Sequence, residues 1–140
     1  MRQFIAAICG KAGTFAQCRY TTKAAIEARF GSENVSTWST LASTDTPTIK
    51  TARITSAIAV VSDEFDEILR SVPGLEGKLP LSTVSDNVTD KMAVAAGLWL
   101  YSPHATDDYA ETPGYLPWLK RDYMNWIEEI RTGKRKLDVK

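Results

Sequence analysis

The chain has 140 residues, of which 44% are hydrophobic and 24% are charged, with 17 basic residues balanced by 17 acidic ones. These proportions are typical of one globular domain and argue against wholesale disorder. A formal net charge of zero argues against a general nucleic-acid-binding protein, which would carry an excess of basic residues. No stretch approaches the ~20 apolar residues of a membrane span, so no membrane contact is expected.

Residues 1–19 are treated as an N-terminal extension, because neither a helical nor a strand pattern is clear in them. The apolar run from Phe4 to Cys9 is shorter than a typical secretory core. Both cysteines of the chain, Cys9 and Cys18, lie here and could bridge only a local loop. Two cysteines make no disulfide framework, which favours an intracellular protein of a reducing compartment.

The first predicted helix is short and covers KAAIEARF. Thr21 or Thr22 is expected to cap its start, and Gly31 is expected to end it. The following SENVSTWSTLASTDT is rich in serine and threonine. We predict a loop there with at most one helical turn, anchored by the apolar side chains of Trp38 and Leu41.

A long helix is predicted from Pro47 to Arg70, with Thr46 as its N-cap and proline at its first position. At ~1.5 Å per residue it would be about 36 Å long, enough to span a small domain. Pro73 and Gly74 prevent it from continuing. One face carries a stripe of apolar residues at helical spacing, which predicts that the rest of the chain covers this face: Ile54, Ala57, Ile58, Val61, Phe65, Ile68 and Leu69.

The segment VPGLEGKLPL after the long helix is predicted to be a structured loop, whose leucines dock on the core. Ser85 or Asp86 is then expected to cap another helix, which covers Asn87 to Tyr101. This helix is apolar on more than one side and rich in alanine. Such a helix is buried, so we expect it to cross the long helix in the core.

A polar connection is predicted from Ser102 to Leu116, and the last helix from Pro117 to Ile130, with Gly133 after it. No strand pair with hairpin turn residues is found. The sequence therefore predicts an all-α bundle of about four helices built round one long central helix. The helical domain covers residues 20–133, and residues 134–140 form an extended C-terminal arm.

Few residues suggest chemistry. Asp63, Glu64, Asp66 and Glu67 form an acidic cluster on the long helix, but no histidine accompanies them as in a di-metal bundle. A solvated or interface-facing helix edge is the simpler interpretation. His104, the single histidine, stands in a predicted loop with no identifiable nucleophile, and a solvated loop residue is expected. We therefore expect no enzyme, no metal and no cofactor.

The region from Trp99 to Trp126 holds seven of the thirteen aromatic residues of the chain. Core packing can account for some of them. Tyrosine and tryptophan are also enriched in protein–protein interfaces. Both interpretations remain open for this region.

Four landmarks occur in this order: TTKAAIEARFG near the start, a long helix ending in FDEILRSVPGLEGKLPL, an alanine-rich helix ending in GLWLY, and YMNWIEEIRTGKRKL. Together they resemble the Mu-type gp36 family of tailed-phage proteins, which is akin to head–tail adaptor (connector) proteins. The resemblance covers Tyr20 to Leu137 and depends on spacing and helix pattern, not on a catalytic signature. Residues 1–19 depart from the family's usual pattern.

The resemblance implies a structural subunit of the virion neck, made in the host cytoplasm. Such adaptors form rings, typically dodecameric, under the portal protein, with a tail-side neck or tail terminator protein bound below. DNA passes through the lumen without sequence-specific binding. The alternatives are a small helical nucleic-acid-binding regulatory protein and a small enzyme that uses His104 with nearby acids.

Two candidate surfaces follow from these expectations. Tyr109, Tyr115 and Trp118 are predicted to lie in the interface between subunits. The C-terminal arm is predicted to add to the portal ring as an extended segment, although a frayed tail that complements the helix dipole is the alternative. Its predicted contact residues are Arg131, Lys134, Arg135, Lys136, Leu137 and Val139.

Overall fold

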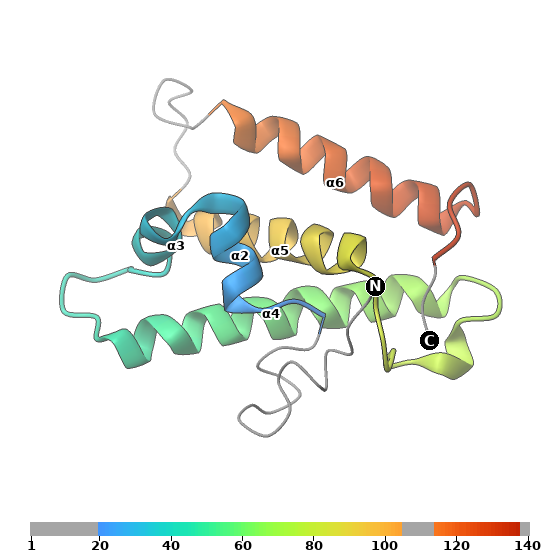
Figure 1. The fold of residues 1–140 in the computed structure, drawn as a ribbon, viewed down its shortest axis with the longest axis horizontal. Helices are drawn as coiled ribbons and strands as arrows, with labels where there is room; N and C mark the ends of the chain where they lie inside the picture. The colour runs from blue at the N-terminus through green and yellow to red at the C-terminus, as the bar shows by residue number, and fades with distance from the viewer. Residues whose placement is uncertain (1–19, 105–113, 138–140) are drawn as a thin grey trace.

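A computed structural model describes residues 20–104 and 114–137, and within these ranges every regular element is helical. This confirms the predicted all-α bundle. The predicted division at residues 19 and 133 stays a prediction. The elements, labelled as in Figure 1, are α2 (Lys23–Phe30), α3 (Ser32–Trp38), α4 (Pro47–Arg70), α5 (Asp86–Tyr101) and α6 (Tyr115–Arg131), with short 3₁₀ turns η2 (Glu76–Lys78) and η3 (Ser102–His104).

The long helix α4 forms one side of the molecule, and α5 lies between α4 and α6 (Figure 1). α2 and α3 also pack against α5, so α5 contacts all four of the other described α-helices. Its apolar residues point in several directions, and most of them are buried. The prediction that this alanine-rich helix lies in the core against the long helix is therefore confirmed.

The predicted helix starts are confirmed where a side chain caps the first turn. Thr46 Oγ1 accepts a hydrogen bond from Ile49 N at 3.2 Å, and α4 covers the predicted residues 47–70. Thr22, not Thr21, caps α2, and Ser85, not Asp86, caps α5. Each cap satisfies a backbone N–H of the first turn that has no partner inside its helix.

The prediction of a loop with at most one helical turn after Gly31 is wrong, because the seven-residue helix α3 makes about two turns there. Gly31 has φ +91° and ends α2, and the chain then enters α3 at once. A positive φ is accessible to glycine at little cost. No side chain caps the start of α3, so the usual sequence signal for a helix start is missing. Burial of Val35 and Trp38 holds this short helix on the core.

The predicted connection from Ser102 to Leu116 includes helical residues at both of its ends. Residues 102–104 form η3, and α6 begins at Tyr115 instead of Pro117. Proline is tolerated here because the first-turn N–H groups of a helix have no intrahelical partner. Leu116 is buried and anchors this first turn on the core. Residues 105–113 lie outside the described residues.

The core consists of two clusters of buried side chains. The first core cluster joins α2, α3, the first half of α4, the second half of α5 and the start of α6, and it includes Phe30, Trp38 and Ile58. The second core cluster joins the other halves of α4, α5 and α6 with Tyr20 and the segment before α5. Phe65 stacks on Trp126 at its centre, with ring centroids 5.5 Å apart.

A buried polar contact crosses the second core cluster. Tyr20 O–H donates to Asp66 Oδ1 at 2.6 Å, and the same hydroxyl oxygen accepts from Leu81 N at 2.9 Å. Asp66 is only 2% exposed. The prediction of a solvated or interface-facing acidic edge is therefore wrong for Asp66, although the other three acidic residues of that cluster are exposed. A buried carboxyl group requires such partners, because burial without them is costly.

Candidate functional site

Two aromatic side chains are exposed at the start of α6. Tyr115 is 44% exposed and Trp118 is 60% exposed, and we call them the α6 aromatic pair. They lie three residues apart, on neighbouring positions of the helix surface, while Leu116 and Leu119 turn inward to the first core cluster. Tyr109, the third predicted interface residue, lies outside the described residues. Exposed tryptophan and tyrosine are typical of interface anchors.

Other aromatic residues of this region belong to the core. Trp126 is buried, and Tyr123 packs against both core clusters. Burial raises the pKa of Tyr123 above its usual value, and the negative charge of Glu64 adds to this. The described aromatics of the region therefore divide. Tyr101, Tyr123 and Trp126 pack in or against the core, whereas Trp99, which is 37% exposed, and the α6 aromatic pair lie at the surface.

A groove of about 400 Å³ lies at the opposite end of α6, and we call it the C-terminal groove. One wall is the turn that follows α4, and the other is the segment that follows α6 (Figure 1). Gly74 at φ +87° and Gly133 at φ +80° allow the chain to turn at these two places. The floor is apolar and consists of Val72, Leu75, Ile130 and Leu137.

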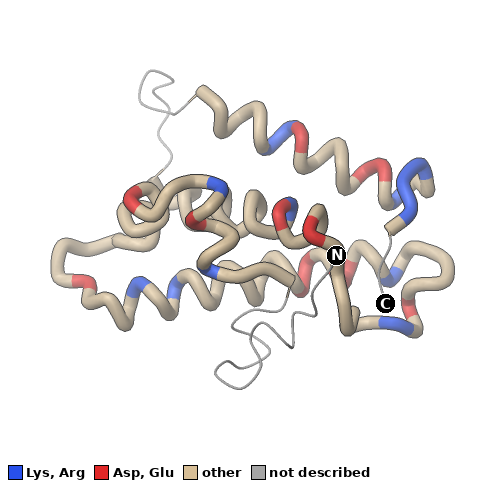
Figure 2. Tube along the Cα trace, viewed as in Figure 1, with Lys and Arg blue, Asp and Glu red and all other residues tan. Residues whose placement is uncertain are grey.

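The rim of the C-terminal groove is basic. Lys78, Arg135 and Lys136 line it, and Figure 2 shows basic residues gathered over η2 and the C-terminal segment. The guanidinium of Arg135 is bound to Glu129, with Nε 2.9 Å from Oε1. In the described part of the chain, neither Lys78 nor Lys136 forms an ion pair with a carboxylate. The groove therefore combines an apolar floor with two uncompensated positive charges.

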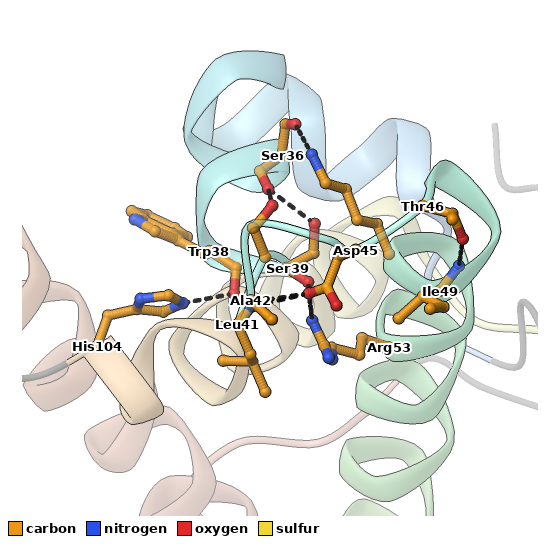
Figure 3. A network of polar contacts seen from close by, with 12 residues as sticks. Ser36, Trp38, Ser39, Leu41, Ala42, Asp45, Thr46, Ile49, Arg53 and His104 are labelled. Atoms are coloured by element: carbon orange, nitrogen blue, oxygen red, sulfur yellow. Dashed lines mark hydrogen bonds and ion pairs between the residues drawn. The ribbon is translucent and has the colours of Figure 1, made fainter.

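A polar network orders the connection between α3 and α4 (Figure 3). Arg53 donates to Ser39 O at 2.7 Å and also to Asp45 Oδ2. That carboxylate oxygen accepts from the backbone N–H groups of Leu41 and Ala42, at 2.8 and 3.0 Å. The hydrogen bond from Arg53 and then those from the backbone lower the pKa of Asp45 to about 2. All these donors are used within the chain, so the network supports the fold.

The sequence of the chain matches a known protein family. The family described as bacteriophage Mu, Gp36 matches residues 20–140. The chain belongs to the bacteriophage Mu Gp36 family. This confirms the resemblance and makes the chain a bacteriophage protein. No curated protein and no solved structure gives a significant match.

In this Gp36-family chain, His104 is not the solvated loop residue that was predicted. It belongs to η3, is half-buried, and its Nε2 lies 2.9 Å from Trp38 O. A carbonyl oxygen only accepts hydrogen bonds, so Nε2 carries the proton and donates. His104 therefore ties η3 to the end of α3.

The described part of the Gp36-family chain contains neither a cluster of metal-ligating side chains nor a helix that could span a membrane. Across residues 20–104 and 114–137, no three His, Cys, Asp or Glu side chains come together as a metal site would require. A smaller hollow of about 200 Å³ lies between α2, α3 and the start of α4, and Lys50 there donates to Ser36 Oγ at 3.2 Å. None of the helices in the described ranges is both long and apolar enough to cross a bilayer.

The predicted arm of the Gp36-family chain follows the surface of its own domain as far as Leu137. Leu137 packs against the second core cluster. Arg135 N donates to Glu129 O at 3.0 Å, and the Arg131 guanidinium is 2.9 Å from Glu128 Oε1. Lys134 and Lys136 are exposed, and Val139 lies outside the described residues. Portal binding by this segment stays a prediction.

Sequence reasoning named the basic residues after Gly133 but missed the groove that they line. The other wall, from Val72 to Lys78, is about sixty residues away along the chain, so its position beside them depends on how α4 and α6 pack. One signal was present in the sequence. Gly74 and Gly133 each follow a long helix, and a basic residue follows each turn.

Proposed function

We propose that this Gp36-family chain is a head–tail connector subunit of a tailed bacteriophage. It forms a ring, dodecameric by its resemblance to adaptor proteins, in the virion neck between the portal and the tail. Its role is structural: it catalyses no reaction, binds no cofactor and does not contact a membrane. Family membership supports the bacteriophage origin of this role.

The observation that carries the proposal is the separation of two unlike surfaces. The α6 aromatic pair lies at the start of α6 and the C-terminal groove lies at its end. Figure 1 shows how far apart these two ends of α6 are. A closed ring is built from heterologous contacts, in which one surface of each subunit binds a different surface of the next. An aromatic surface at one end and an apolar, basic groove at the other provide two such surfaces.

The ring has two kinds of partner besides itself. The portal protein binds the C-terminal segment, through Arg131, Lys134 and the residues up to Val139. A tail-side neck or tail terminator protein binds the opposite face of the ring. DNA passes through the lumen without sequence-specific contacts, as a balanced net charge allows.

The test is electron microscopy of virions that carry a labelled copy of this protein. The expected result is a ring of label between head and tail. Label on the capsid shell or at the tail tip, or virions without the protein, would contradict the proposal. The alternative, a nucleic-acid-binding regulator, predicts DNA affinity that falls steeply with salt concentration.

A pair of variants tests the role of the α6 aromatic pair in assembly. Tyr115→Ser with Trp118→Ser should weaken ring formation and leave helicity unchanged, because both side chains are exposed. Met124→Ser is the matched control, since Met124 is 55% exposed on another side of α6. Light scattering measures assembly and circular dichroism measures helicity. Loss of helicity in the double variant would instead place these side chains in the core.

A further inference from the structure

We propose that the C-terminal groove of each subunit receives the acidic connection between α5 and α6, residues 105–113, of the neighbouring copy. The inference rests on the proposed ring and names the contact that builds it. It assigns Lys78, Lys136 and the apolar floor to self-assembly. It thereby narrows the portal contact proposed above, within the described residues, to the exposed Arg131 and Lys134.

The groove defines the chemistry of its occupant. Its floor, formed by four apolar side chains, favours an apolar or aromatic group. Its rim presents Lys78 and Lys136 without carboxylate partners in the described part of the chain. The occupant should therefore carry carboxylates on either side of an aromatic residue, since charged groups in an interface are arranged to complement one another.

Residues 105–113 have this composition. The sequence ATDDYAETP contains three acidic residues, Asp107, Asp108 and Glu111, and no basic one. Tyr109 lies among them and can fill the apolar floor. The acidic edge of α4 is a weaker candidate, because its exposed carboxylates lie on a helix too wide to enter a groove of about 400 Å³.

The connection of residues 105–113 is too short to reach the C-terminal groove of its own subunit. Both ends of the connection, His104 and Gly114, are fixed at the end of the molecule where α6 begins. A nine-residue connection that starts and ends at the same place can reach outward by at most about half its extended length. At ~3.5 Å per residue this reach is ~16 Å. The 17 residues of α6 are about 25 Å long at ~1.5 Å per residue. The contact must therefore join two copies, and it is heterologous as a ring requires.

Charge reversal tests the pairing in the full-length protein. Lys78→Glu with Lys136→Glu should lower ring formation roughly tenfold or more, and Asp107→Lys with Asp108→Lys should do the same, because like charges then face each other. Combining the four changes should restore most of the assembly. Lys23→Glu with Lys120→Glu is the control, with the same change in net charge away from the groove. No recovery in the combined variant would overturn the inference.

Photo-cross-linking in virions separates the inference from the proposed function. A photoreactive residue at Leu75, on the groove floor, should cross-link to residues 105–113 of another copy, identified by mass spectrometry. Cross-links to the portal or to any other segment, or no cross-link, would overturn the inference but leave the connector role intact. Absence of the protein from the neck would overturn the connector role as well.

Discussion

The first and second core clusters differ in where their polar groups lie. In the first, the side chains are apolar, and the hydrogen bonds of Arg53 and His104 run round its edge. In the second, the contact of Tyr20, Asp66 and Leu81 passes through the interior. Among the described residues, Trp126 of the second cluster also has a buried Nε1 without a hydrogen-bond partner.

The two clusters therefore constrain the arrangement of the helices in different ways. Apolar contacts are non-directional, so the arrangement of the first cluster depends on how closely the shapes of its side chains fit. The hydrogen bonds of the second cluster join three segments that are distant in sequence, and each needs a particular geometry. A satisfied polar network in the interior specifies one arrangement at some cost in desolvation. The segment before α2 and the one before α5 are fixed in this way.

The largest effect is expected from Phe65→Ala, in the second core cluster. Phe65 is fully buried, stacks on Trp126 and meets Tyr20 edge-on at 6.0 Å. Its removal should lower the free energy of unfolding by ~3–5 kcal/mol, through lost burial and the cavity that remains. Urea denaturation measures this. Glu67→Ala, on the exposed side of the same helix, should be nearly neutral, and a Phe65→Ala loss below about 1 kcal/mol would mean that this region is not a true core.

The next largest effect is expected from Asp66→Ala, which removes the acceptor of the Tyr20 hydroxyl. We expect a loss of about 2–3 kcal/mol, because a buried donor is left unsatisfied. Tyr20→Phe removes the other partner and also leaves Leu81 N without its acceptor. A double-mutant cycle between positions 20 and 66 should give a coupling free energy of about 1 kcal/mol or more. Additive losses would show that the contact does not couple the two segments.

Gly97→Ala tests the first core cluster, and a smaller effect is expected. A Cβ at position 97 would lie 2.1 Å from Phe30 Cε2. Phe30 is itself held against Trp38, with ring centroids 5.1 Å apart. We expect a loss of about 1–2 kcal/mol, because overpacking costs more than the gain in helix propensity of alanine over glycine. Unchanged thermal stability would mean that α2 can shift away from α5 freely.

Local sequence signals were enough to predict the long elements. Thr46 and Pro47 fixed the start of α4, and its apolar stripe fixed the buried face. α3 was missed because Gly31 both ends one helix and starts the next, with no capping side chain. Asp66 was misjudged for another reason. A carboxylate on a helix is normally exposed, and its burial depends on Tyr20, whose position no local pattern reveals.

The candidate surfaces were less predictable than the fold. Tyr115 and Trp118 are exposed, and their place in an interface stays a prediction. The sequence placed Tyr115 in a loop, whereas it lies in the first turn of α6. The C-terminal groove needs both of its walls, and only tertiary packing brings Leu75 beside Leu137. Helix periodicity reports which face of one helix is buried. It does not report which distant segments meet.

The smallest effect is expected at the edge of the first core cluster, in the acid titration of Asp45. Its folded pKa, about 2, lies below the ordinary value of 3.8, chiefly because Arg53 donates to the carboxylate. A lowered folded pKa stabilises the folded connection above pH ~4, and this contribution disappears as the pH falls through about 2. Arg53→Ala should raise the pKa of Asp45 toward 3.8, which NMR titration of its carboxyl group measures. Hydrogen exchange of the Leu41 and Ala42 amides should then accelerate at neutral pH, while that of the Tyr20–Leu81 contact stays slow. Equal acceleration of hydrogen exchange at the Leu41 and Ala42 amides and at the Tyr20–Leu81 contact would contradict the prediction. It would mean that the polar contacts of the two clusters do not act independently.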